Sequence, residues 1–148
     1  MPCLILTIGL PGAGKTTWAY KYMLENPLTK IISTDEVRLQ LTGSTDCIAC
    51  MNPLIYAEAR RQAQLFLYAG YDVIIDSTNV TSEDWLSYEQ ICTPDTIFIA
   101  KLFFIPPSNC FEQIARRERK VPLAILEMKW KHLLHNYRFL PFFFDIII

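Results

Sequence analysis

Residues 9–16 read Gly-Leu-Pro-Gly-Ala-Gly-Lys-Thr, a match to the pattern G-x-x-x-x-G-K-[ST] of the phosphate-binding P-loop. An apolar run at 4–8, typical of a buried strand, precedes it, and a helical pattern follows from residue 15. Glycines let the backbone curl so that successive N–H groups point at phosphate oxygens, and the N-terminal end of the following helix adds positive charge. A plain strand-to-helix connection is the alternative, but the agreement of strand, loop and helix favours a nucleotide site.

The side chains of this loop have distinct expected roles. Lys15 would reach the β- and γ-phosphates of ATP, and the Thr16 hydroxyl would ligate Mg²⁺. ATP and Mg²⁺ are therefore the predicted cofactors. The residues expected to contact the nucleotide here are Gly9, Pro11, Gly12, Ala13, Gly14, Lys15, Thr16 and Thr17.

The composition is that of a globular domain. The chain has 148 residues, of which 51% are apolar and 20% charged, so we expect a single domain over 1–148 with a substantial core. The net charge of −1 argues against a bulk electrostatic clamp on long duplex nucleic acid and leaves a local basic groove as the way to hold such a partner. No apolar run approaches the length of a membrane span, so no membrane partner is expected.

The cysteines indicate a reducing environment. There are five, an odd number at scattered positions, and no secretory signal pattern accompanies them, so we expect reduced thiols and a cytoplasmic location. Cys47 and Cys50 form a C-x-x-C, but no second pair lies at zinc spacing. We interpret them as ordinary loop cysteines.

Strand and helix patterns alternate along the chain. Strands are expected at 3–8, 30–32, 72–76 and 96–105, with a fifth at 142–148. Helices are expected at 15–25, 34–41, 54–69, 81–91, 109–120 and 123–136, the fifth of them capped by Ser108. This alternation predicts an α/β fold, with a doubly wound, mostly parallel sheet of four to five strands and helices on both faces.

Asp35 and Arg38 stand three residues apart at the start of a predicted helix and so share one of its faces. They follow the second strand, at the carboxyl edge where α/β sheets bind ligands. Asp35 would accept the proton of an attacking hydroxyl there, and Arg38 would hold an anionic group of the acceptor. The alternative is helix capping, since Ser33 and Glu36 form a capping box, but this leaves Arg38 unexplained.

Asp76 ends the third strand and opens the turn Asp-Ser-Thr-Asn at 76–79. An aspartate at this place can hold the Mg²⁺ shell through water. Ser77, instead of a glutamate, follows it, which weakens the interpretation as a water-activating ATPase. For Ser77 and Asn79, local hydrogen bonding within the turn is an equally good explanation.

Four cations, Arg116, Arg117, Arg119 and Lys120, lie within five residues beyond the fourth strand. They would close over the phosphates as a short lid and neutralise transition-state charge. A solvated helix face is the alternative, because Glu112 and Arg116 are spaced for an ion pair. We favour a lid in which at least one arginine contacts the phosphates.

The sequence resembles the phage-type polynucleotide 5′-kinases, the kinase half of the phage polynucleotide kinase–phosphatases. The likeness is carried by the P-loop with its Thr-Trp-Ala continuation at 17–19, by Asp35 with Arg38, by the strand and turn at 74–79, and by the basic segment and Val-Pro at 116–122. It runs from residue 4 to about residue 130. The Asp-Ser order in the turn, the short segment 42–52 and the short lid depart from the phage pattern.

The resemblance implies a P-loop kinase that uses ATP and Mg²⁺ to phosphorylate the 5′-hydroxyl of DNA or RNA ends, a reaction of nucleic-acid end repair. Asp35 would be the general base, and Arg38 would contact the acceptor's phosphate. The implied catalytic residues are Lys15, Asp35, Arg38 and Arg119, the residues at the metal Thr16 and Asp76, and the lid residues on the nucleotide Arg116 and Arg119. The sequence has no Asp-x-Asp-Gly-Thr phosphatase signature, so no 3′-phosphatase activity is expected.

Two other functions fit the motifs. One is a kinase for a small molecule such as a nucleoside, a sugar or an antibiotic, since P-loop kinases have many acceptors. The other is an ATP-binding switch or ATPase subunit. The apolar stretch from Phe139 is either the last core strand or an exposed patch that supports a homo-oligomer.

Overall fold

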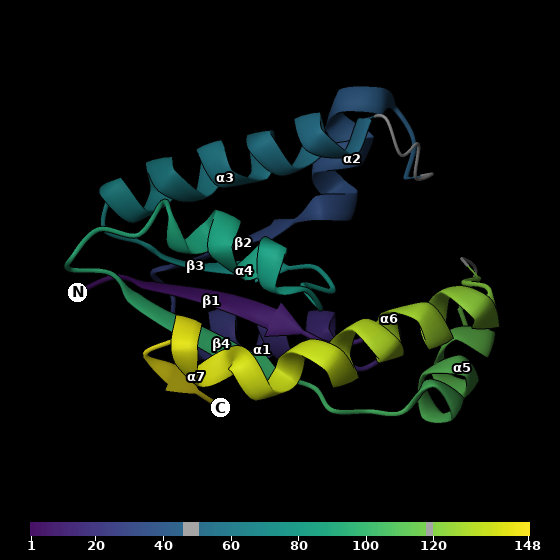
Figure 1. Ribbon diagram of the computed structural model, residues 1–148. Helices are drawn as coiled ribbons and strands as arrows, with labels where there is room; N and C mark the ends of the chain where they lie inside the picture. Colours follow the sequence, from purple (N-terminus) through teal and green to yellow (C-terminus); the bar gives the residue numbers. More distant parts are fainter. Residues whose placement is uncertain (46–50, 118–119) are drawn as a thin grey trace.

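Five parallel strands form the centre of the protein in the computed structural model, which describes residues 1–45, 51–117 and 120–148 (Figure 1). The strands are β1 (Cys3–Ile8), β2 (Thr29–Ser33), β3 (Asp72–Asp76), β4 (Ile97–Leu102) and β5 (Ile146–Ile147). Their order in the sheet is β2-β3-β1-β4-β5, and each neighbouring pair is parallel. The predicted α/β sheet is confirmed.

Helices cover both faces of this sheet. They are α1 (Lys15–Glu25), α2 (Thr34–Thr42), α3 (Asn52–Tyr68), α4 (Ser82–Glu89), α5 (Pro107–Ala115), α6 (Leu123–Asn136) and α7 (Leu140–Phe143), with a 3₁₀ turn η2 (Tyr137–Phe139) before α7. Helix α1 packs on one face, where Ala19 meets Ile5 and Ile74. Helices α3, α4 and α6 cover the other face and enclose the larger core cluster. Within the described ranges, no helix is long and apolar enough to cross a membrane.

The central strand β1 explains why the run before the P-loop is apolar throughout. Leu4, Leu6 and Ile8 point into the larger core, whereas Ile5 points to the side of α1, and all four are fully buried. Alternate residues of a strand face opposite sides, so a strand covered on both sides needs apolar residues at both. The P-loop therefore leaves the sheet at its centre, next to the carboxyl end of β3.

The segment between β4 and α5 differs from the sequence-based expectation. Strand β4 ends at Leu102, three residues earlier than predicted, and the helix runs over Pro107–Ala115 instead of 109–120. Pro106 occupies the N-cap, and no side chain caps the helix, so the predicted Ser108 cap is wrong. Pro107 is the first residue of the helix, and a proline suits this position because its missing N–H would have had no helical partner there.

The C-terminal segment, predicted as one strand over 142–148, is a helical turn followed by a two-residue strand. Leu140 and Phe144 are 3% and 6% exposed and belong to the core, whereas Phe142 is 82% exposed. Asp145 fixes the change of direction: its Oδ2 accepts the Phe98 N–H at 2.9 Å, and its own N–H donates to the Phe98 carbonyl at 2.8 Å. The segment is thus a core element with an apolar outer side, and the homo-oligomer contact there stays a prediction.

Candidate active site

The predicted nucleotide-binding loop joins β1 to α1. Its members are Gly9, Pro11, Gly12, Ala13 and Gly14 in the loop and Lys15, Thr16 and Thr17 in the first helical turn. Gly12 and Gly14 have φ angles of 83° and 94°, a left-handed conformation that favours glycine. A Cβ on Gly12 would lie only 2.8 Å from the Cys110 carbonyl oxygen, so α5 supports the loop from behind.

Lys15 is held inside the loop. Its side chain is buried, and its Nζ donates a hydrogen bond of 2.6 Å to the Leu10 carbonyl oxygen. Burial lowers the pKa of Lys15 to about 8, and the neighbouring carboxylate of Asp76 opposes this shift. The amine is therefore fixed inside the loop, where burial disfavours its positive charge. A bound anion such as a phosphate would stabilise that charge.

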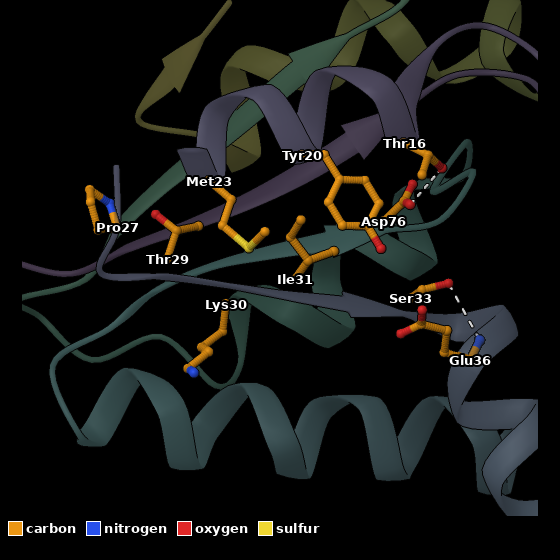
Figure 2. A pocket seen from close by; sticks show the side chains of 10 residues that line it. All are labelled: Thr16, Tyr20, Met23, Pro27, Thr29, Lys30, Ile31, Ser33, Glu36 and Asp76. Atoms are coloured by element: carbon orange, nitrogen blue, oxygen red, sulfur yellow. Dashed lines mark hydrogen bonds between the residues drawn. The ribbon is translucent and has the colours of Figure 1, made fainter. Parts of the chain in front are cut away.

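Thr16 in the first turn of α1 contacts Asp76 at the end of β3. The Thr16 hydroxyl donates to Asp76 Oδ2 at 2.7 Å, drawn as a dashed line in Figure 2. Burial raises the pKa of Asp76, while the Thr16 hydrogen bond and Lys15 act in the opposite direction. Hydroxyl and carboxylate oxygens suit Mg²⁺, which is usually bound by one or two protein groups together with phosphates and water. The described part of the chain has no group of three His, Cys, Asp or Glu residues that could hold a metal ion.

A cavity of about 430 Å³ between α1 and β2 reaches this pair (Figure 2). Tyr20, Met23 and Ile31 form its walls, and Thr16 and Asp76 lie at one end. The glycines of the P-loop and Lys15 are not part of its lining. The cavity therefore adjoins the predicted metal position from the side opposite α3, α4 and α6.

The turn after β3 braces the P-loop. Asn79 is buried with φ 46°, and its Nδ2 donates to the Thr7 carbonyl at 2.9 Å. The Trp85 indole N–H donates to the Asn79 carbonyl at 2.6 Å, and the Gly9 N–H donates to the Thr78 carbonyl at 3.0 Å. These bonds fix the turn to β1, so Asn79 has the local structural role that the sequence left open.

Asp35 and Arg38 come together as the sequence predicts. Arg38 Nη1 donates to Asp35 Oδ1 at 2.9 Å, and Arg38 Nη2 donates to Asn52 Oδ1 at 3.3 Å. The two side chains differ in access, since Arg38 is 7% exposed and Asp35 is 53% exposed. The Ser33 cap is present as well, because Ser33 Oγ accepts the Glu36 N–H at 3.4 Å. Capping and the Asp35–Arg38 pair thus coexist in one helix start.

The predicted lid is described only in part. Arg119, the best sequence candidate for the phosphate contact, and the Cys47–Cys50 pair lie outside the described residues. Arg116 follows α5 and is exposed, and no ion pair joins it to Glu112 within the described ranges. Arg117 stands closer to the site. Burial is the main cause of the lowered pKa of Lys15, and the charge of Arg117 lowers that pKa further. The same charge favours the ionised form of Asp76.

Lys129 on α6 is a cation at the site that sequence reasoning missed. Its Nζ donates to Thr78 Oγ1 at 3.2 Å. Burial is the main cause of the lowered pKa of Lys15, and the charge of Lys129 lowers that pKa further. The packing of α6 against the turn after β3 brings it there. Helical periodicity alone does not distinguish Lys129 from Lys131 on the same helix.

Comparisons with known proteins agree with this geometry. The model of a family described as "AAA domain" matches residues 4–140. A chain of a solved Pnkp1/Rnl/Hen1 RNA repair complex superposes with a TM-score of 0.82 at 20% identity, covering 93% of this chain and 45% of that one. A chain of another Pnkp1/Rnl/Hen1 complex gives 0.68 at 22% identity, covering 82% and 40%. A gluconokinase from Sinorhizobium meliloti 1021 gives 0.61 at 14% identity, covering 89% and 75%.

These likenesses concern the fold. They confirm the predicted α/β fold of a P-loop kinase. The chain spans less than half the length of the two repair-complex chains that it matches. The fold implies nucleotide binding. Binding of the nucleotide at the loop of residues 9–16 stays a prediction.

Proposed function

We propose a function on the premise that the chain belongs to the AAA domain family and has the fold of a P-loop kinase. The proposed activity is transfer of the γ-phosphoryl group of ATP to a hydroxyl, and the proposed acceptor is the 5′-hydroxyl end of DNA or RNA. Thr16 and Asp76 would hold Mg²⁺ beside the phosphates. The bound ion would supply charge neutralisation at the β- and γ-oxygens.

One hydrogen bond carries this proposal. Thr34 Oγ1 donates to Ser77 Oγ at 2.9 Å, which joins the residue before Asp35 to the residue after Asp76. The candidate base in the first turn of α2 is thereby tied to the candidate metal position at the end of β3. A phosphotransferase needs the acceptor hydroxyl and the transferred group side by side at such a place.

The exposure of Asp35 supports its role as general base. Its carboxylate is half exposed, so a substrate hydroxyl can reach it, while the buried guanidinium of Arg38 fixes its orientation from one side. A carboxylate that accepts the hydroxyl proton as the new O–P bond forms is the standard requirement of this reaction. Lys15 and a lid arginine would compensate the charge on the phosphates.

The burial of Arg38 favours a second candidate, a kinase for a small acceptor that carries no phosphate. Arg38 already donates to Asp35 and Asn52 and is 7% exposed, so an acceptor without a phosphate would need only Asp35. The gluconokinase likeness shows the same fold and carries no more than that. The two candidates differ in whether a phosphate on the acceptor improves its use.

A panel of acceptors separates them. Phosphate transfer from Mg-ATP is followed by mass shift for a 5′-hydroxyl DNA oligonucleotide, its RNA counterpart, a nucleoside 3′-monophosphate, a free nucleoside and gluconate. Transfer to the oligonucleotides that is lost in Asp35→Asn, with ATP binding retained, supports the proposal; Glu36→Gln, one residue along the same helix, is the matched control. Transfer to gluconate or the free nucleoside alone would replace it by the small-molecule kinase.

A further inference from the structure

The cavity of about 430 Å³ in Figure 2, which we name the α1–β2 cavity, extends well beyond the predicted metal position. Thr16 and Asp76 at one end belong to that position, whereas the walls and the far end have no part in the proposed reaction. Small-molecule sites in proteins usually measure about 300–1,000 Å³. The cavity is therefore large enough to hold a ligand of its own beside the metal.

Two matched faces form the walls. On α1, Tyr20 and Met23 follow Thr16 at intervals of four and three residues and so share one face of the helix. On β2, Thr29 and Ile31 are two residues apart and so point to the same side of the strand. Because β2 is the outermost strand of the described sheet, no neighbouring strand in that part of the chain closes the cavity. The cavity is thus a slot with largely apolar walls that opens at the edge of the sheet.

The seating of α1 explains why this space is left unfilled. Ala19 packs against Ile5 of β1 and Ile74 of β3, so the helix lies over the centre of the sheet. Ile31 of β2 only borders this cluster and is half-buried. The α1 side of β2 is therefore lined by side chains without being covered by the helix.

Thr29 brings a buried hydroxyl without a partner to the cavity. The residue is 3% exposed, and within the described ranges its Oγ1 makes no hydrogen bond. Figure 2 shows this oxygen on the side of β2 on which α1 lies. A buried hydroxyl without a partner lowers stability, and valine, which has nearly the same shape and suits strands, would avoid this cost. The fold does not account for the hydroxyl, whereas a ligand with a hydrogen-bonding group would.

The charges around the cavity do not suit an anion. Lys30 is the only cation among the described lining residues, and its Nζ lies 4.9 Å from the centre of the Tyr71 ring, on the other face of β2. Asp76 and Glu36 place carboxylates at the end away from Thr29. Asp76 already accepts a hydrogen bond, and Glu36 is exposed, where an ion pair contributes little. An uncharged ligand therefore fits this lining better than a charged one.

We infer that the α1–β2 cavity binds a small uncharged molecule with a flat aromatic body, whose carbonyl or hydroxyl oxygen accepts a hydrogen bond from Thr29. The body would lie between Tyr20 and Met23 on α1 and Ile31 on β2, since aromatic rings pack well on rings and thioethers. Thr29 and Ser33 are about 13 Å apart along the strand, so a molecule of one or two rings fits. The inference is independent of the proposed function, because it concerns binding without ATP or acceptor.

The test measures binding of benzamide, which is uncharged, and of benzoate and benzamidine, its anionic and cationic analogues of the same shape. Ligand-observed NMR titrations up to about 10 mM suit fragments of this size. We expect benzamide to bind the wild type about tenfold more tightly than either charged analogue, which would lose hydration without gaining a partner. Met23→Trp, which fills the slot, should abolish the binding. No binding of benzamide, equal binding of a charged analogue, or binding that survives Met23→Trp would overturn the inference.

Thr29→Val tests the hydroxyl, and Thr96→Val is the matched control. Thr96 is also buried, at 8% exposed, but its Oγ1 accepts the Thr93 N–H at 3.1 Å. Thr29→Val should weaken benzamide binding about fivefold, as for the loss of one neutral hydrogen bond, without lowering the free energy of unfolding in urea. Thr96→Val should lower the free energy of unfolding and leave the binding unchanged. Unchanged binding in Thr29→Val, or a loss of stability equal to that in Thr96→Val, would show that the hydroxyl serves the fold and would overturn the inference.

Discussion

Removing the amine of Lys15 should change how the stability of the protein depends on pH. The side chain is 8% exposed, and burial lowers its pKa from 10.5 to about 8. The unfolded chain keeps this proton up to about pH 10.5, whereas the folded protein releases it near pH 8, so the unfolded state binds more protons between these values. The free energy of unfolding therefore rises with pH in this window, and the charged lysine costs stability below it.

The size of the effect follows from the two pKa values. Their difference of about 2.5 amounts to about 3.4 kcal/mol over the whole window, because one pKa unit corresponds to 1.36 kcal/mol. Integrating the difference in bound protons from pH 7 to pH 9.5 gives about 2 kcal/mol of this total.

The assay is urea unfolding of the wild type, Lys15→Met and Lys21→Met at pH 7 and pH 9.5. Lys21 is exposed on the same helix and is the matched control. The change in stability between the two pH values should be about 2 kcal/mol more favourable in the wild type and Lys21→Met than in Lys15→Met. Equal changes in all three proteins would refute the idea that the P-loop lysine is desolvated.

Two further substitutions test the metal position and the brace of the loop. Asp76→Asn should raise the Mg²⁺ concentration needed for half-maximal transfer by about tenfold while nucleotide binding without Mg²⁺ is retained; an unchanged Mg²⁺ titration would remove Asp76 from the metal site. Asn79→Ala should lower the free energy of unfolding by about 1–3 kcal/mol, because it leaves the buried Thr7 carbonyl without its donor. Asn26→Ala, which loses a bond at a partly exposed helix end, should cost less, and urea unfolding that shows equal losses would contradict the buried brace.

The parts of the fold that the sequence predicts best are those with strong local signals. Helices α1 and α6 begin and end at the predicted residues, since the P-loop and Pro122 mark their starts and Asn26-Pro27 ends the first. The C-terminal strand is not predictable in the same way. Its apolar residues fit a strand equally well throughout, and only the bonds between Asp145 and Phe98 of β4 decide where the chain turns.

Some parts of the candidate site can be predicted from the sequence, and others cannot. The P-loop geometry and the Asp35–Arg38 pair follow from spacing within one helix or loop, and spacing is visible in the sequence. Lys129 reaches the site only because α6 packs against the turn after β3, a contact between residues 51 positions apart. Such long-range contacts depend on the tertiary arrangement, so the place of Lys129 has no signal in the sequence.

The central claim is that phosphate leaves ATP for a hydroxyl of the acceptor and not for water. The most direct measurement is the amount of ADP formed with and without a 5′-hydroxyl oligonucleotide, set against the amount of 5′-phosphorylated product. We predict slow ADP formation alone, a large acceleration by the oligonucleotide, and one 5′-phosphate for each ADP above the background. ADP formation at the same rate with and without acceptor, and no phosphorylated oligonucleotide, would contradict the kinase and favour an ATPase or a nucleotide switch.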